Sequence, residues 1–213
     1  MNIIAINGSP RKGWNTHMLI EEAVRGAASS GAKTEIINLY ELSFRGCISC
    51  MECKRTGGPS LGRCAVKDNL RPVLDKIDSC DGLIFGSPIY FHEITASSRA
   101  FIERLFFQYL SYNSDSAPFF KRRINTALIF TMNAASSRFE ETGYPAKFKA
   151  YEALFSRILG PAQSLLCTET WQVSDYSKYE MNRFNVAERK KRREEVFPLD
   201  LNKAFEMGKA LAG

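Results

Sequence analysis

The N-terminal segment constrains the fold more than any other part of the chain. An uninterrupted apolar run, Ile3–Ile6, leads directly into a loop of small and polar residues, Asn7–Thr16, and a helical pattern follows. A run that is apolar at every position is typical of a strand buried on both faces of a parallel sheet. The first backbone N–H groups of the following helix have no intrahelical partner and carry partial positive charge, so they attract an anion. The loop also offers a phosphate one guanidinium and three polar side chains: Arg11, Ser9, Asn15 and Thr16.

Apolar runs and helical patterns alternate along the rest of the chain, which predicts an α/β fold with a doubly wound parallel sheet. Five expected strands favour the flavodoxin-like order 2-1-3-4-5 in a three-layer α/β/α arrangement. In such sheets a ligand lies beyond the carboxyl ends of the strands, beside the first strand. The expected strands are 3–6, 35–39, 82–86, 127–130 and one from Ser164, and the main helices are expected at 70–77, 95–109, 148–158 and within 179–211.

The sequence shows no internal repeat and no second domain. We expect residues 1–213 to form one flavodoxin-like domain, with a cysteine-rich insertion at about 41–69 and a helical tail from about 175. Apolar residues make up 45% of the chain, which is typical of a globular protein. The net charge of +6 does not by itself imply nucleic acid as a partner. The N-terminus lacks a basic segment and no apolar run is long enough to span a membrane, so we expect a cytoplasmic protein without a membrane partner.

Two further loops are expected at the same sheet edge as the first. The loop after the third strand, Ser87–His92, contains Pro88, which stiffens it, and two aromatic residues, Tyr90 and Phe91. Backbone N–H groups from Ile89 onward are available to the carbonyl groups of a ligand, and the aromatic residues offer area to a flat heterocycle. The loop after the fourth strand, 131–136, adds Asn133. Together the three loops predict a site for a phosphate, a flat ring and the polar rim of that ring.

Several other functions are disfavoured by missing motifs. The first loop lacks the Gly-Lys-Ser/Thr ending of a nucleoside triphosphate site, and no Gly-x-Gly-x-x-Gly follows the first strand. The chain has only two histidines, His17 and His92, and no Gly-x-Ser-x-Gly, so a hydrolase is weakly supported.

Three segments together carry a family resemblance. Gly8–Arg11 with Asn15 and Thr16, then Ser87–Tyr90, then Ala100–Arg104 resemble the NADPH-dependent FMN reductase family over roughly residues 1–135. The resemblance implies FMN bound without a covalent bond, its phosphate on the first loop and its isoalloxazine ring on 88–91, with NAD(P)H as a transient substrate. It also implies a homodimer or homotetramer. The expected FMN contacts are Ser9, Arg11, Asn15, Thr16, Pro88, Ile89, Tyr90, Phe91 and Asn133, and no catalytic side chain is expected because the flavin carries the chemistry.

Four of the six cysteines are clustered. Cys47, Cys50 and Cys53 are spaced by two residues each, and Cys64 follows after a glycine-rich segment. This spacing suits a [4Fe–4S] cluster, zinc is the main alternative, and free or redox-active thiols are the third reading. The segment 46–53 resembles the iron–sulfur flavoproteins within the same family. The remaining two cysteines, Cys80 and Cys167, are expected in the core.

The basic run at 188–195 is expected to be the solvated face of a helix. The function predicted from the whole sequence is that of an FMN-dependent NAD(P)H oxidoreductase in which an iron–sulfur cluster relays electrons to the flavin. Two alternatives stay open. One is a non-catalytic electron carrier between a ferredoxin and a partner, and the other is a zinc-stabilised interaction domain.

Overall fold

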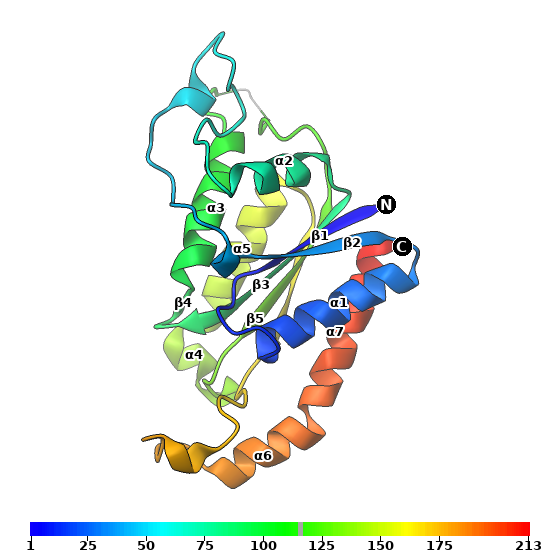
Figure 1. Cartoon of the computed structure of the whole chain (residues 1–213), viewed down its shortest axis with the longest axis vertical. Helices are drawn as coiled ribbons and strands as arrows, with labels where there is room; N and C mark the ends of the chain where they lie inside the picture. The colour runs from blue at the N-terminus through cyan, green and yellow to red at the C-terminus, as the bar shows by residue number, and fades with distance from the viewer. Residues whose placement is uncertain (115–116) are drawn as a thin grey trace.

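A central parallel sheet organises the chain in the computed structural model, which describes residues 1–114 and 117–213 (Figure 1). The strands that form it lie in the order β2-β1-β3-β5-β6. Counted among the parallel strands alone, this is the predicted flavodoxin-like order. The strands are β1 (Asn2–Asn7), β2 (Lys33–Asn38), β3 (Gly82–Tyr90), β5 (Asn125–Thr131) and β6 (Ala162–Cys167).

The third strand is longer than predicted. Residues expected to form a loop continue β3 as far as Tyr90, because Ile89 and Tyr90 pair in antiparallel fashion with Ile94 and Glu93 of the short strand β4 (Glu93–Ile94). The two-residue strand β4 has no periodic signal of its own in the sequence, which is why the prediction missed it.

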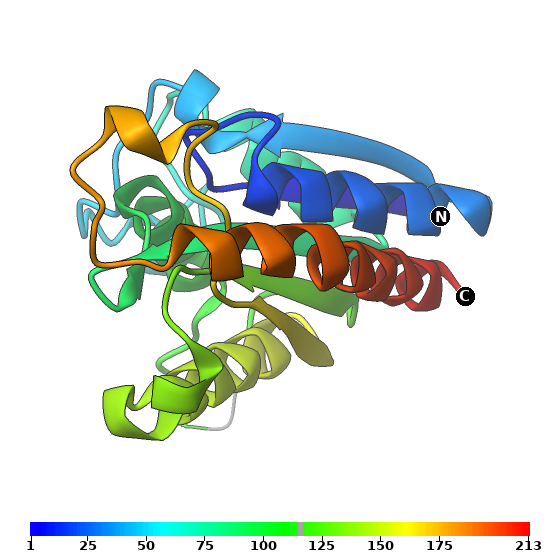
Figure 2. The same ribbon diagram turned by 90° about the horizontal axis from the view of Figure 1, so that it is seen from below.

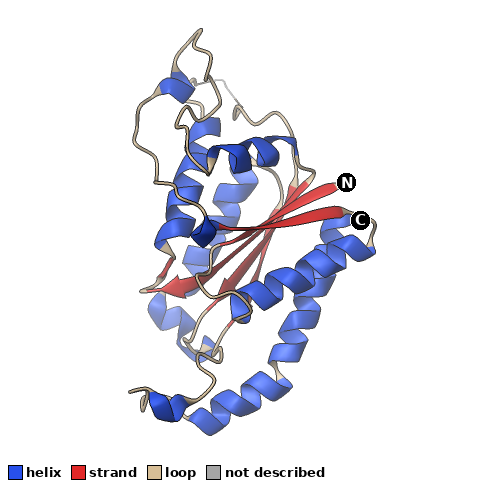
Figure 3. Cartoon of the chain, viewed as in Figure 1, coloured by secondary structure: helices blue, strands red, loops and turns tan. Residues whose placement is uncertain are grey.

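Helices cover both faces of the sheet (Figures 2 and 3). On one face α1 (Asn15–Ser29) and α7 (Phe197–Ala212) run side by side and contribute to one apolar cluster with the sheet. On the other face α2 (Arg71–Ser79), α3 (Ala96–Tyr109) and α5 (Tyr144–Ile158) enclose a second cluster rich in aromatic rings. The shorter helical pieces are η1 (Leu39–Glu41), η2 (Glu52–Lys54), η3 (Ser136–Arg138), α4 (Phe139–Thr142), η4 (Tyr176–Lys178) and α6 (Val186–Glu195).

Two glycines allow α1 and α7 to approach closely. A Cβ atom added at Gly26 would lie 1.9 Å from the carbonyl oxygen of Phe205, and one at Gly208 would lie 1.8 Å from that of Ala23. Both distances are far below van der Waals contact, so no larger residue fits without separating the helices. The C-terminal helix is therefore packed in the same layer as α1, the helix that follows the first loop.

The expected core cysteines are confirmed as buried: Cys80 is 1% exposed and Cys167 is 0% exposed. Among the described residues, no helix combines the length and apolar character required to cross a membrane.

Candidate functional site

A cleft opens at the carboxyl ends of β1, β3 and β5, where the sequence predicts the ligand. It encloses about 510 Å³, including its open mouth. Every predicted FMN contact except Phe91 lines it, and the structure adds five residues that the sequence analysis missed. The lining residues are Ser9, Arg11, Trp14, Asn15, Thr16, Pro88, Ile89, Tyr90, Thr131, Met132, Asn133, Thr170 and Gln172.

The first loop is a tight turn held by its own side chains. The side-chain oxygen of the buried Asn7 accepts a hydrogen bond from the Ser9 N–H at 3.0 Å, and the Ser9 hydroxyl accepts one from the Arg11 N–H at 3.1 Å. Gly13, with a φ of +71°, then turns the chain into α1. No side chain among the described residues caps the start of α1, and its first turn holds no acidic residue. The N-terminal N–H groups are thus suited to an anionic ligand.

A glycine fixes the height of this loop above the sheet. The Gly8 N–H donates to the Gly86 carbonyl at 2.8 Å, and the Thr95 hydroxyl donates to the Gly8 carbonyl at 2.8 Å. A Cβ atom at Gly8 would lie 1.9 Å from the Ser98 hydroxyl oxygen. Glycine is therefore required where the loop after β1 crosses the start of α3.

Arg11 reaches the cleft stacked on an aromatic ring. Its guanidinium carbon lies 3.6 Å from the centre of the Trp14 ring, a cation–π contact that holds the charge beside the uncapped start of α1. The sequence analysis identified Arg11 but not Trp14. The spacing of three residues between Arg11 and Trp14, just before a helix, was the one feature of the sequence that could have predicted this contact.

The fourth side of the cleft comes from the segment after β6. The Asn15 amide donates to the Trp171 carbonyl at 2.7 Å, and the N–H of Thr170 donates to the Met132 carbonyl at 3.1 Å. The predicted cleft had only three loops because this segment, at 168–172, carries neither a glycine motif nor an aromatic pair that the sequence analysis matched to a cofactor.

Tyr90 lines the cleft and Phe91 does not. Tyr90 is half-exposed, and burial raises the pKa of its phenol, so it stays neutral near pH 7. Phe91 and His92 form the two-residue turn between β3 and β4 with φ values of +49° and +67°, which directs Phe91 away from the cleft and leaves it 100% exposed. The structure therefore does not bring Phe91 to the other predicted contacts.

Asn133 lines the cleft and carries an acceptor without a partner. Its backbone carbonyl accepts a 3.0 Å hydrogen bond from Arg189, while its side-chain oxygen is buried and has no hydrogen-bond partner among the described residues. A buried acceptor left unpaired costs free energy, so such groups commonly meet a ligand. An N–H on the polar rim of a flavin is a suitable donor. The cleft thus offers a polar acceptor at one end and an anion site at the other, which fits FMN.

The four clustered cysteines line one cavity near the C-terminal end of α3. Cys47, Cys50, Cys53 and Cys64 all contribute to its wall, together with Arg104. No three or more His, Cys, Asp or Glu side chains in the described ranges are placed so that they could hold a metal ion, and the cysteines are free. The structure gathers the predicted ligands at one place without forming a coordination site.

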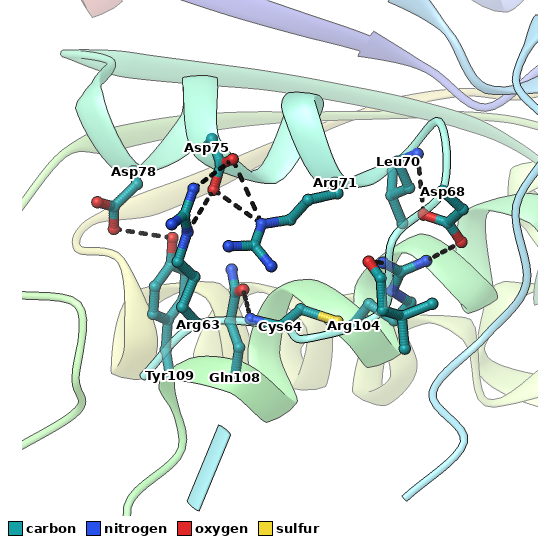
Figure 4. A network of polar contacts seen from close by, with 11 residues as sticks. Arg63, Cys64, Asp68, Leu70, Arg71, Asp75, Asp78, Arg104, Gln108 and Tyr109 are labelled. Atoms are coloured by element: carbon teal, nitrogen blue, oxygen red, sulfur yellow. Dashed lines mark hydrogen bonds and ion pairs between the residues drawn. The ribbon is translucent and has the colours of Figure 1, made fainter. Parts of the chain in front are cut away.

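The segment that carries Cys64 is fixed to α2 and α3 by polar contacts (Figure 4). Gln108 accepts a 2.8 Å hydrogen bond from the Cys64 N–H, and the fully buried Arg104 side chain forms a 2.5 Å ion pair with Asp68. Burial alone would lower the pKa of Arg104, but Asp68 and the nearby Cys64 thiol raise it. Lys54, the residue after Cys53, donates to the Gln108 carbonyl at 3.1 Å.

Helix α3 links the cleft to the cysteine cavity. Thr95, its N-cap residue, contacts the phosphate loop through Gly8, and Gln108 near its C-terminal end contacts Cys64. A helix of this length spans about 20 Å. The two candidate sites therefore lie at opposite ends of one buried helix.

The chain is similar to known flavoproteins. The family model for NADPH-dependent FMN reductase matches residues 1–135. An iron–sulfur flavoprotein of Methanocaldococcus jannaschii is 36% identical over 104 residues, 49% of this chain and 51% of that protein. One from Archaeoglobus fulgidus is 34% identical over 104 residues, 49% of this chain and 48% of that protein. The chain spans about half the length of these curated relatives.

A solved structure shares the fold over nearly the full length. The NAD(P)H:quinone oxidoreductase from Methanothermobacter marburgensis superimposes with a TM-score of 0.74 at 14% sequence identity, covering 99% of this chain and 98% of that one. At this identity the likeness shows the flavodoxin-like fold alone. The family match includes the loop after β1, the end of β3 and β5, which together form most of the cleft, and on that match the chain belongs to the NADPH-dependent FMN reductase family.

Proposed function

We propose that the protein is an FMN-dependent oxidoreductase that takes electrons from NAD(P)H and passes them to a small acceptor. The observation that supports this most is the pairing, within one cleft, of an uncapped helix start flanked by Arg11 with the unpartnered side-chain oxygen of Asn133. FMN has a phosphate for the first and a polar ring edge for the second. In this proposal residues 1–213 act as a single FMN-binding unit.

The residues of the chain bind and orient the cofactor. When bound, FMN supplies a ring that exchanges hydride or single electrons with small molecules. Arg11 and the N–H groups of the first turn of α1 hold the phosphate, and Pro88 to Tyr90 flank the ring. Neither histidine lines the cleft, and burial raises the pKa of the Tyr90 phenol, so Tyr90 stays protonated near neutral pH. The described residues that line the cleft therefore include no side chain suited to act as a general base.

Titration of FMN into the purified chain tests this proposal, with binding followed by flavin fluorescence and turnover by oxidation of NADH or NADPH with a quinone acceptor. We expect stoichiometric flavin, with absorption bands at about 375 and 450 nm, and acceptor-dependent turnover. Flavin binding without turnover with either nicotinamide would instead favour the electron carrier. Protein that takes up no FMN would contradict both functions.

A second proposal concerns the cysteine cavity. We infer that Cys47, Cys50, Cys53 and Cys64 hold a [4Fe–4S] cluster after their side chains turn toward a common centre. Its support is the shared cavity, the thiol donor set and the two cations beside it, Lys54 and Arg104, which offset the negative charge of four thiolates. Relatives that match this part of the chain are named iron–sulfur flavoproteins.

Anaerobic purification with iron, sulfide and zinc analysis distinguishes the metal readings. We expect about four irons per chain, lost in Cys50→Ser and retained in Cys80→Ala, because Cys80 is buried away from the cavity. Stoichiometric zinc would replace the cluster with a structural site. Metal-free protein in which the four cavity thiols react with a thiol reagent would show that these cysteines are free thiols.

A further inference from the structure

The basic run of α6 divides into an outward face and an inward face. Lys190 and Lys191 are 67% and 72% exposed, whereas the Arg189 side chain is 11% exposed. Arg192 is also turned inward and forms a 2.5 Å ion pair with Asp200 of α7. The run is therefore not simply the solvated helix face that the sequence predicted. Arginines at helical spacing face the molecule, and the lysines between them face solvent.

Arg193 lies against the first turn of α1. One guanidinium nitrogen donates a 3.1 Å hydrogen bond to the side-chain oxygen of Asn15, and another lies 3.3 Å from the sulfur of Met18. The guanidinium carbon is 4.0 Å from the centre of the Phe197 ring. Three contacts thus hold this positive charge one side chain behind the anion site.

The contact with Arg193 also changes the role of Asn15. Its side-chain oxygen accepts from Arg193 and its amide nitrogen donates to the Trp171 carbonyl. Both ends of the side chain are engaged within the protein. Asn15 therefore acts on a phosphate chiefly through its backbone N–H, at a helix start whose position Arg193 helps to fix.

Arg189 makes the corresponding contact at the other end of the cleft. It donates a 3.0 Å hydrogen bond to the backbone carbonyl of Asn133, and its second nitrogen forms an ion pair with Glu169 at 3.3 Å. The loop after β5 is thus held by its main chain. This leaves the side-chain oxygen of Asn133, a residue that lines the cleft, without a partner in the described part of the molecule.

We propose that α6 fastens both ends of the cofactor cleft, with Arg193 as a positioning residue for the phosphate and Arg189 as a positioning residue for the ring. The inference rests on the proposed function. Helix α6 lies outside residues 1–135, so the family match does not include it. Because the two arginines act at different ends of the ligand, their effects are separable: Arg193 acts on a ligand that carries a phosphate, and Arg189 acts on the ring with or without a phosphate.

Binding of FMN and of riboflavin to the full chain tests this separation. We expect Arg193→Gln to weaken FMN binding by about tenfold and riboflavin binding by less than about threefold, since the variant removes the positive charge behind the anion site and the support of Asn15, and only FMN carries a phosphate for that site. Arg193→Lys, which keeps the charge, should restore most of the FMN affinity. Arg189→Gln should weaken both ligands by a similar factor. Lys190→Gln and Lys191→Gln carry the same charge change on the outward face and should leave both affinities within about twofold.

The outcomes distinguish this inference from the proposed function beneath it. Wild-type protein that takes up no flavin overturns both. Wild-type protein that binds FMN, with Arg193→Gln binding it equally well, overturns the inference alone. Equal losses of FMN and riboflavin in Arg193→Gln, or equal losses in the lysine variants, also overturn it, because they would reflect packing or overall charge. If Arg193→Gln does not fold, Arg193→Met, which removes the charge and keeps an apolar stem against Phe197, gives the same comparison of FMN with riboflavin. Equal affinity of this variant and the wild type for FMN would likewise overturn the inference.

Discussion

The hydroxyl groups of Thr16 and Thr131 lie 2.7 Å apart and share a hydrogen bond across the floor of the cleft. Thr16 belongs to the first turn of α1 and Thr131 ends β5, and both side chains are buried. This single bond joins the loop proposed to bind the phosphate to the loop proposed to meet the ring. Each hydroxyl depends on the other for its hydrogen bond, because a buried polar group without a partner lowers the free energy of unfolding.

A double-mutant cycle measures this dependence. We expect Thr131→Val and Thr16→Val each to lower the free energy of unfolding by roughly 1–3 kcal/mol, because each leaves one buried hydroxyl unpaired. The double variant should lose clearly less than the sum of the two, since valine replaces both hydroxyls with methyl groups of similar shape. Urea unfolding gives the three values. Strict additivity would mean that the two hydroxyls do not depend on each other.

Arg11 should select for the phosphate of the cofactor. Removal of its guanidinium in Arg11→Ala is expected to weaken FMN binding by about tenfold or more and riboflavin binding much less. Lys12→Ala is the matched control, because Lys12 is exposed and pairs with Glu41 rather than lining the cleft. Flavin fluorescence titration reads both ligands. A loss in the control as large as that in Arg11→Ala would point to general attraction by positive charge.

Phe91 should be replaceable without loss of the cofactor. Its φ of +49° is a conformation that asparagine adopts more readily than phenylalanine, and its side chain is fully exposed. Phe91→Asn is therefore expected to raise the free energy of unfolding by roughly 0.5–1 kcal/mol and to leave FMN affinity within about twofold. Tyr90→Ala, one residue earlier in the cleft, should weaken FMN. Weaker binding in Phe91→Asn than in Tyr90→Ala would restore Phe91 as a cofactor contact.

Local pattern was enough to predict the sheet and most of the cleft. The run Ile3–Ile6 is buried as expected, and the loops at its end and after β5 contribute their predicted residues, because strand ends of a parallel sheet meet at one edge. The sequence did not predict that Phe91 lies apart from the other expected contacts, and the reason is physical. The turn Phe91–His92 has left-handed backbone at both positions without the Asn-Gly signal that normally announces it.

Contacts distant in sequence account for the rest of the site. Arg193 meets Asn15 across a separation of 178 residues, and periodicity within α6 cannot say which face of that helix meets which partner. The same holds for Trp171, whose carbonyl closes the cleft against Asn15. Arg193 can be assigned to the site only once the packing of α7 on α1 is known, and that packing depends on Gly26 and Gly208.

The packing of α7 on α1 is expected to tolerate no side chain at Gly208. A Cβ there would lie 1.8 Å from the carbonyl oxygen of Ala23, so Gly208→Ala must separate the helices. We expect a loss of roughly 1–3 kcal/mol or more in the free energy of unfolding. Gly213→Ala, where the nearest atom is 3.7 Å away, is the control and should change stability little. Thermal and urea unfolding compare the two, and equal stability would mean that the helices are further apart than described.

Asp75 should make the stability of the protein depend on pH in the acidic range. Hydrogen bonds from Arg63 and Arg71 hold the pKa of this carboxyl below its usual value, with burial opposing them (Figure 4). Arg63 lies in the segment before α2, whereas Arg71 precedes Asp75 by one turn within α2. The pKa of Asp75 is lower in the folded than in the unfolded state. Its contribution to the free energy of unfolding is therefore complete above about pH 4 and is lost as the pH falls through the folded pKa.

Asp75→Asn is expected to be less stable than the wild type at pH 7 by roughly 0.5–1 kcal/mol, since the pair is partly exposed. That difference should shrink steadily below about pH 4, where the wild-type carboxyl takes up its proton. Urea unfolding at pH 7, 4 and 3 follows it, with the exposed Glu206→Gln as the control. A difference that stays constant down to pH 3 would show that Asp75 stabilises the fold by shape alone, because only an ionised carboxylate pairs with the two guanidinium groups.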